Sequence, residues 1–204
     1  MMMTRKTPEK ASRQHAPILW IDGVGGYLLI DREQVTIGQA IADNAVDIGI
    51  VGDIRRQAGT IRRSGEDYLL HPLQATQLNE RAIDRPQLLR HQDMVQFGQR
   101  VCVRFTKPNP LSATARLDLL SIGRFQPRVD AVLLLADTCL IGAATGCHIA
   151  CPQWNHQLTL VRRNEGWFFR SPVALQAAGE LQTGPIAATP GLRLCGDDFS
   201  LSIE

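Results

Sequence analysis

The sequence predicts an all-β fold made of two antiparallel β-sandwiches in tandem. Its apolar stretches are short and β-rich, and Gly, Pro, Asn or Asp interrupts them every few residues. No segment keeps the 3.6-residue apolar period of a helix over three turns. The chain also repeats one order of strand-like stretches in its two halves, and internal repetition is a strong sign of duplicated modules.

The first half contains a series of strand candidates with turn residues between them. Val101, Val103 and Phe105 fall on one side of the last candidate, and Cys102 and Arg104 fall on the other, which is the period of two expected of a strand. The other candidates are Ile18–Ile21, Tyr27–Ile30, Val35–Ile37, Ile48–Val51, Thr60–Arg63, Tyr68–Leu70 and Met94–Phe97. Many short strands of this kind indicate a sandwich or a barrel.

The second half repeats the same order. Its strand candidates are Leu117–Leu120, Val132–Leu135, Cys139–Ile141, Ile149–Cys151, Leu158–Val161, Trp167–Phe169, Leu192–Cys195 and Phe199–Ile203. Three pairs of anchors align the halves: Ile37-Gly38 with Ile141-Gly142, Thr60–Arg63 with Leu160–Arg163, and the late glycines Gly98 and Gly196, each followed by alternating apolar residues.

These alignments divide the chain into a tail, two modules and a linker. We expect a disordered tail at residues 1–17, a first sandwich at 18–107 and a second at 116–204. Residues 108–115 contain two prolines, which cannot donate to a strand ladder, and they read as a short linker between the modules.

Charge and composition exclude several classes of function. The net charge is +2, and the basic excess lies in the N-terminal tail; residues 18–107 have 11 basic and 11 acidic side chains, and residues 116–204 have 7 and 8. Neither half therefore has the surplus that a nucleic-acid-binding face needs. The longest apolar run, Ala131–Ala136, is far too short to span a membrane. Without a signal sequence at Met1–Lys10, the five cysteines are expected to be reduced and the protein cytoplasmic.

The ordered motifs of the first half resemble the forkhead-associated (FHA) domain family. The fragments that carry the resemblance are Ile37-Gly38-Gln39, Asp47-Ile48-Gly49-Ile50, Arg55-Arg56-Gln57-Ala58-Gly59-Thr60-Ile61, Tyr68-Leu69-Leu70-His71, Gln74-Ala75-Thr76-Gln77-Leu78-Asn79 and Leu89-Arg90-His91-Gln92-Asp93, followed by Phe97-Gly98. The second half is similar to this family more weakly, through Ile141-Gly142, His148-Ile149, Trp167-Phe168-Phe169 and Gly196. The resemblance implies two tandem FHA-like domains, the second degenerate.

The family resemblance implies binding of phosphopeptides, usually phosphothreonine peptides, by loops at one end of the sandwich. Phosphate needs guanidinium, hydroxyl and backbone N–H donors on rigid loops. The family pattern is altered at several of these positions: its first Arg is Gln39, its Ser is Arg55, its His is Ala58, and its Asn-Gly pair is Gln74-Ala75. Arg56, Thr76 and Asn79 are retained.

The candidate phosphopeptide-binding residues are therefore Gln39, Arg55, Arg56, Gln74, Thr76 and Asn79. Arg55 and Arg56 together provide ten N–H donors for a phosphate or a carboxylate. The alternative interpretation is that both are solvated loop charges. In the second half, Ala143 stands where Gln39 stands in the first, and Trp154–Gln157 replace the family's Ser-Arg-x-His stretch.

Other chemistry has weaker support in the sequence. Cys139, Cys147, His148, Cys151 and His156 suggest zinc, but Cys147, Ile149 and Cys151 share one face of a predicted strand, which favours a buried core. No nucleophile elbow or phosphate loop occurs, and Gly23–Gly26 reads as a hairpin turn.

We therefore expect a non-enzymatic protein–protein interaction module, with a protein or phosphopeptide partner and no metal or cofactor. Two alternatives remain open: a scaffold that binds partners independently of phosphorylation, and a small enzyme or metal protein that uses Cys and His.

Overall fold

The protein consists of strands and turns throughout the part that the structure describes. This computed structural model describes residues 16–43 and 45–204. No helix occurs in these residues, so none there is long and apolar enough to cross a membrane. The predicted all-β class is confirmed. Most of the expected tail lies outside the described residues, whereas Ala16 packs against the core and the Pro17 carbonyl accepts the Leu29 N–H at 2.9 Å.

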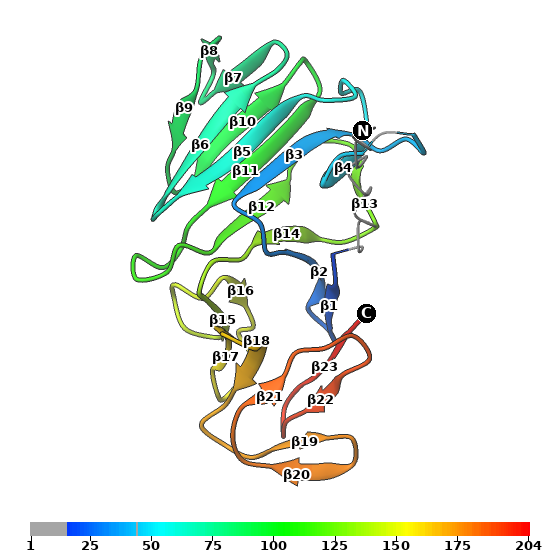
Figure 1. Cartoon of the computed structure of the whole chain (residues 1–204), viewed down its shortest axis with the longest axis vertical. Helices are drawn as coiled ribbons and strands as arrows, with labels where there is room; N and C mark the ends of the chain where they lie inside the picture. Colours follow the sequence, from blue (N-terminus) through cyan, green and yellow to red (C-terminus); the bar gives the residue numbers. More distant parts are fainter. Residues whose placement is uncertain (1–15, 44) are drawn as a thin grey trace, which may run out of the picture.

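One twelve-stranded sheet runs through the whole molecule (Figure 1). Its strands, in spatial order, are β20 (Glu180–Gln182), β19 (Leu175–Ala177), β22 (Arg193–Cys195), β23 (Ser200–Ile203), β1 (Ile18–Ile21), β2 (Gly25–Ile30), β14 (Ala131–Leu134), β12 (Ala115–Leu119), β11 (Val101–Thr106), β10 (Asp93–Phe97), β7 (Thr76–Leu78) and β8 (Arg81–Ile83).

Two smaller sheets pack against this long sheet. The six-stranded sheet contains, in spatial order, β13 (Arg124–Gln126), β4 (Ile48–Val51), β3 (Gln34–Gln39), β5 (Gly59–Ser64), β6 (Asp67–Pro72) and β9 (Gln87–Leu89). The five-stranded sheet contains β16 (Ile149–Ala150), β15 (Thr138–Gly142), β17 (Leu158–Arg163), β18 (Gly166–Arg170) and β21 (Ile186–Ala187). We call the part of the molecule around the six-stranded sheet the first module and the part around the five-stranded sheet the second module.

The two small sheets share one strand arrangement. In the first, β3 pairs in parallel with β4 and antiparallel with β5, and Ile37 lies opposite Ile48. In the second, β15 pairs in parallel with β16 and antiparallel with β17, and Ile141 lies opposite Ile149. The predicted anchors Ile37-Gly38 and Ile141-Gly142 therefore occupy corresponding strands.

The long sheet repeats in the same way, with its central strands exchanged between the halves of the sequence. Strand β12 pairs with β11, the last strand before residues 108–115, and β1 pairs with β23, the last strand of the chain. Strands β1 and β2 precede the first module in the sequence but complete the second, whereas β12 and β14 follow the first module and complete it. In Figure 1 the dark-blue β1 and β2 lie beside the red β23.

Two hydrophobic cores result from this exchange. The first core includes Phe97, Phe105 and Leu70 from the first half of the sequence, together with Leu117 and Phe125 from beyond residues 108–115. The second core includes Phe169, Leu160 and Trp154, together with Leu19 and Ile21 from the start of the described chain. The cores therefore do not follow the expected division into residues 18–107 and 116–204, because each draws strands from both sides of the linker.

Strands β2 and β14 belong to both cores. On β2, Leu28 and Ile30 enter the first core and Tyr27 and Leu29 enter the second. On β14, Val132 and Leu134 enter the first core and Ala131 and Leu133 the second. Strands buried on both faces read as continuous apolar runs, which explains the unbroken run Ala131–Ala136. The two strands pair in parallel, Leu28 opposite Val132, and join the modules.

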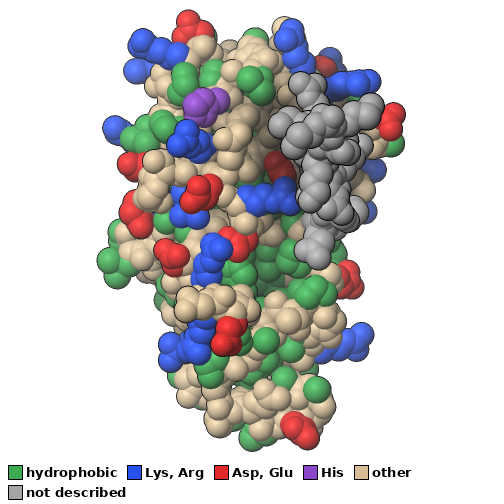
Figure 2. All heavy atoms as spheres, viewed as in Figure 1, with side chains coloured by type: hydrophobic (Ala, Val, Ile, Leu, Met, Phe, Trp, Pro, Cys, Tyr) green, Lys and Arg blue, Asp and Glu red, His purple; other side chains and the backbone are tan. Residues whose placement is uncertain are grey.

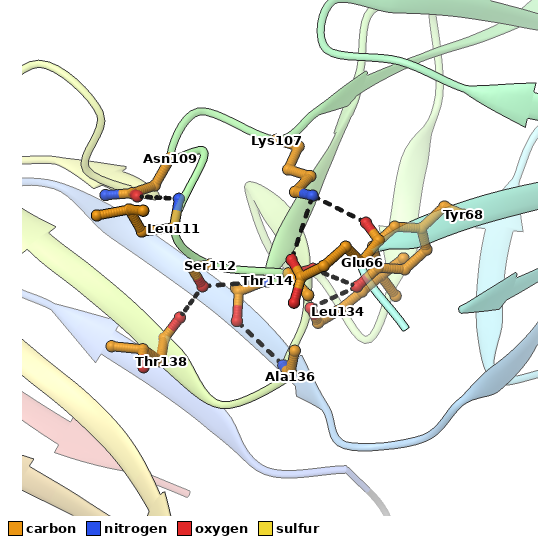
Figure 3. A network of polar contacts seen from close by, with 11 residues as sticks. Glu66, Tyr68, Lys107, Asn109, Leu111, Ser112, Thr114, Leu134, Ala136 and Thr138 are labelled. Atoms are coloured by element: carbon orange, nitrogen blue, oxygen red, sulfur yellow. Dashed lines mark hydrogen bonds and ion pairs between the residues drawn. The ribbon is translucent and has the colours of Figure 1, made fainter. Parts of the chain in front are cut away.

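The second half of the expected linker, residues 112–115, is buried and hydrogen-bonded (Figure 3), whereas Pro110 and Leu111 are exposed. Ser112 donates from its hydroxyl to the Thr138 carbonyl at 2.6 Å, and the Thr114 hydroxyl oxygen accepts the Ala136 N–H at 3.0 Å. The buried Tyr68 hydroxyl lies 2.8 Å from the Ala113 carbonyl oxygen. Residues 112–115 are buried because they lead directly into β12, which the first core needs.

Candidate functional site

The loops that carry the candidate residues meet at one end of the first module. The Gln39 N–H, at the end of β3, donates to the Arg55 carbonyl at 2.9 Å. The Leu73 N–H donates to the Ala58 carbonyl at 2.9 Å, and the Gly98 N–H donates to the Ala75 carbonyl at 2.8 Å. These backbone bonds tie the β4–β5, β6–β7 and β10–β11 loops to one another.

Gly38 allows the β4–β5 loop to lie directly on β3. A Cβ atom at this position would stand 1.8 Å from the carbonyl oxygen of Arg56 and 2.7 Å from its carbonyl carbon. Both are backbone atoms, so a side chain could be accommodated only if the loop moved. The glycine of the Ile37-Gly38 motif is therefore required for close approach of two backbones.

The β4–β5 loop carries Arg55 and Arg56 as exposed side chains on an anchored backbone. Both residues are exposed, as is Gln57 beside them. The Arg55 N–H donates to the Gln74 side-chain oxygen at 3.2 Å, which fixes the backbone and leaves the guanidinium outside this contact. Two guanidinium groups on adjacent residues of a braced loop are suited to a doubly charged anion.

Gln74 and Thr76 support the loop from beneath. The Gln74 amide oxygen holds the Arg55 N–H, and its Nε2 is buried, with no hydrogen-bond partner in the part of the chain that is described. Thr76 is 3% exposed, and its hydroxyl donates to the Gln74 carbonyl at 2.9 Å. Gln39 is half-buried beside them.

Asn79 lies elsewhere, in the turn between β7 and β8. Its φ of 48° is left-handed, a conformation that Asn tolerates. Its side-chain amide donates to Asp93 at 2.7 Å, and its side-chain oxygen accepts the Met94 N–H at 2.9 Å. Because Thr76 lies opposite Phe97 whereas Asn79 bonds Met94, Asn79 is about 10 Å further along the sheet.

The structure thus brings Gln39, Arg55, Arg56 and Gln74 together, buries Thr76 below them and separates Asn79. It also adds residues that sequence reasoning missed. Leu73 is 50% exposed beside Gln74, and Arg100, in the β10–β11 turn, forms a loose 3.8 Å ion pair with Asp53. Leu73 could have been found in the sequence as a large apolar residue in a loop. Nothing in the sequence indicates the pairing of Arg100 with Asp53.

The corresponding end of the second module is closed by packing. Gly142 approaches Gln157, as Gly38 approaches Arg56, with its Cβ position 3.2 Å from the Gln157 Cα. Trp154 is buried and stacks on Phe199, with ring centroids 4.2 Å apart. The Asn155 N–H donates to the Asp198 carboxylate. Residues 152–157 contain no Lys or Arg, so this loop brings no cation.

Burial raises the thiol pKa of each cysteine in the predicted Cys/His group. The pKa of Cys151 rises to about 11, and those of Cys139 and Cys147 also rise. Burial lowers the pKa of His148 to about 4, and its Nδ1 accepts the Leu140 N–H at 2.9 Å. Within residues 16–43 and 45–204, no group of three or more His, Cys, Asp or Glu side chains is arranged to hold a metal ion.

Charged side chains are mixed over the surface. Figure 2 shows blue Lys and Arg groups interspersed with red Asp and Glu groups over both modules on the face in view. Ion pairs account for several of them, including Arg162 with Asp31 at 2.8 Å and Arg104 with Asp118 at 3.5 Å. On this face the basic side chains form no continuous area of the kind that a phosphate backbone requires.

Comparison with known proteins gives weak similarity to solved structures. No protein-family model matches the chain, and no curated protein matches it. A solved chain described as "Rv0020c_FHA Structure" is 21% identical, and the match covers 44% of this chain and 91% of that one with a TM-score of 0.26. The presence of two tandem FHA-like copies stays a prediction.

Proposed function

We propose that the protein is a non-catalytic protein-interaction module that binds an acidic or phosphorylated segment of a partner protein through the loop end of the first module. Arg55 and Arg56 provide the positive charge. Gln39 lies beside the arginine loop, where its N–H bonds the Arg55 carbonyl. Gln74 and Thr76 hold the loop in position. Asn79 fixes the β7–β8 turn. The proposal requires no metal and no cofactor.

The observation that carries the proposal is an anchored loop with two exposed cations. The loop backbone is held by Gly38, Gln39 and Gln74, while both arginine residues are exposed. A loop fixed before binding loses little entropy on binding, so its charged hydrogen bonds contribute more fully to affinity. The exposed Leu73 beside this loop offers contact to an apolar side chain of the same segment.

A titration with a degenerate phosphothreonine peptide library tests the proposal. We expect the full chain to bind it, and the double variant Arg55→Ala/Arg56→Ala to bind at least about a hundredfold more weakly, since each charged hydrogen bond contributes about 1.5–3 kcal/mol. Arg81→Ala/Arg85→Ala removes two exposed charges elsewhere and is the matched control. Equal binding by both double variants would refute the proposal.

A phosphorylation-independent scaffold is the second candidate. The internal bonds of Thr76 and Asn79 favour it, because two polar groups of the family's binding pattern are already engaged within the chain. In this case, the unphosphorylated library and its glutamate-substituted form bind as well as the phosphorylated one. Calorimetric titration of the three libraries separates the two candidates.

A further inference from the structure

A second surface feature lies where the two modules meet. Side chains from β1 and from the segment between β12 and β14 line a cavity of about 570 Å³. The half-buried Trp20 and Leu119 give it accessible apolar surface, Phe125 and Val129 lie buried beneath it, and Arg124 and Arg128 are among the residues around it. We call this feature the Trp20 notch.

The lining of the Trp20 notch contains two arginines and one carboxylate, Asp130. Arg124 and Arg128 are both exposed, and neither forms an ion pair with any other residue that the structure describes. The acidic side chain in the lining, Asp130, already accepts the Gly26 N–H at 2.7 Å. A nearby carboxylate, Glu204, accepts the Trp20 indole N–H at 2.9 Å. An occupant that contributes negative charge would therefore complement the two arginines.

An exposed apolar rim adjoins the notch. Ile122 is fully exposed, Leu120 is 45% exposed and Val51 is 36% exposed. The turn that carries Ile122 and Leu120 is held by its backbone: the Leu120 N–H donates to the Cys102 carbonyl at 2.9 Å, and Gly123 approaches the Val51 carbonyl. A single exposed apolar residue is ordinary, whereas several beside a cavity mark an interaction site.

The backbone beside the notch is also available for pairing. Strand β13 is the outermost strand of the six-stranded sheet, so one of its edges has no strand partner among the described residues. Its Phe125 side chain points into the first core, while Arg124 and Gln126 are exposed. An extended segment can add main-chain hydrogen bonds at such an edge and place alternate side chains on the surface.

We propose that the Trp20 notch docks an extended segment of a partner protein in which acidic and large apolar side chains alternate. The acidic side chains pair with Arg124 and Arg128, and the apolar side chains contact Trp20 and the Ile122 rim. This site requires no phosphate. It uses different residues from the Arg55–Arg56 loop, although its rim residue Val51 leads into that loop, so the protein has two neighbouring docking surfaces for partner segments.

Fluorescence anisotropy with defined peptide pools tests this proposal. The probe is a labelled pool of capped octapeptides in which Asp or Glu alternates with Leu, Phe or Trp; one control pool has Lys for the acids, and another has Ser for the apolar residues. We expect the full chain to bind only the acidic–apolar pool. Arg124→Glu/Arg128→Glu should weaken binding roughly tenfold or more. Ile122→Ser, at a fully exposed position, should weaken it by a smaller factor without affecting folding.

Matched variants decide where the pool binds. Arg81→Glu/Arg85→Glu makes the same charge change at exposed positions on and after β8 and should bind as the unmodified chain does. Arg55→Ala/Arg56→Ala should also bind the acidic–apolar pool as the unmodified chain does. The proposal for the Trp20 notch can therefore fail while the proposed function holds, and the proposed function can fail while the proposal for the notch holds. Loss of binding in Arg55→Ala/Arg56→Ala, equal binding of the Lys pool, or no binding at all would overturn the proposal. Binding that appears only when residues 2–15 are removed would also overturn it, since the chain's own N-terminal segment would then be the occupant.

Discussion

The loop ends of the two modules use the same strand frame in different ways. In both modules an Ile-Gly strand lets a neighbouring loop approach its backbone closely, at Gly38 and at Gly142. In the first, the approaching loop carries exposed Arg55 and Arg56; in the second, it carries Trp154, which is buried against Phe199. The strand frame holds a loop in place in each module, and the side chains of the loop decide whether it packs against the module or faces solvent.

Separating the modules should have the largest effect on the protein. A fragment of residues 1–107 lacks β12 and β14, so β11 loses its neighbour and the first core loses Leu117, Phe125 and Leu134. A fragment of residues 108–204 lacks β1 and with it the partner of β23. We expect neither fragment to unfold cooperatively alone, as measured by circular dichroism on heating.

Mixing the two fragments is the control for this prediction. The mixture should recover a cooperative transition, because the exchanged strands can then complete both sheets. Independent cooperative unfolding of the 1–107 fragment would show that its loop end does not depend on the exchange, and the two modules would have to be compared as separate domains.

Replacing Gly38 should have the next largest effect. Gly38→Ala forces the Arg56 backbone away from β3, and overpacking of this kind costs about 3 kcal/mol of unfolding free energy. Binding of the phosphothreonine library should fall as well, because the arginine loop is displaced. Chemical denaturation and the peptide titration measure the two effects.

Gly52→Ala is the matched control for Gly38→Ala. It lies at the start of the same loop, and a Cβ atom there would meet Val101 at an ordinary 3.4 Å. This variant should unfold and bind as the unmodified chain does. If Gly38→Ala behaved in the same way, the close approach would not be what positions the arginines.

A smaller effect is expected on the pH dependence of the unfolding free energy, and it comes from His148 of the second module. Burial lowers the pKa of His148 from 6.5 to about 4, so between these values the unfolded chain binds a proton that the folded protein excludes. The contribution is present in full above pH 6.5 and is lost as the pH falls towards 4, about 3 kcal/mol in total.

His148→Asn should reduce this acid sensitivity, since Asn can still accept the Leu140 N–H but does not titrate in this range. His156→Gln changes an exposed histidine of the same module and is the control. Denaturant titrations at pH 7 and pH 4.5 give the difference. An unchanged pH dependence in His148→Asn would contradict the assignment.

Much of the strand content could be predicted because it rests on local patterns. Ile18–Ile21 and Ile48–Val51 match their strands, and the inward set Val101, Val103 and Phe105 lies in the first core as the alternation predicts. The strands that were missed are mostly two or three residues long and polar or exposed, too short for a period to be recognised: β7, β8, β9, β13, β19, β20 and β21.

The exchange of strands could not be predicted from the repeat alone. Repeated order gives the same strand sequence whether β1 pairs within its own half or with β23, because pairing partners far apart in the chain leave no local pattern. One signal was available: the apolar run Ala131–Ala136 suits a strand buried on both faces. For the candidate site, motif spacing grouped Asn79 with Arg55, whereas the register of β7 against β10 separates them.

The most direct test of the comparison is an amide chemical-shift map of the full chain during titration with a phosphothreonine peptide selected from the library. The account predicts shifts at Gln39, at Arg55 to Gln57 and at Leu73 to Ala75, with residues 152–157 of the second module unchanged. Shifts concentrated on residues 152–157, or the same response at both loop ends, would contradict it.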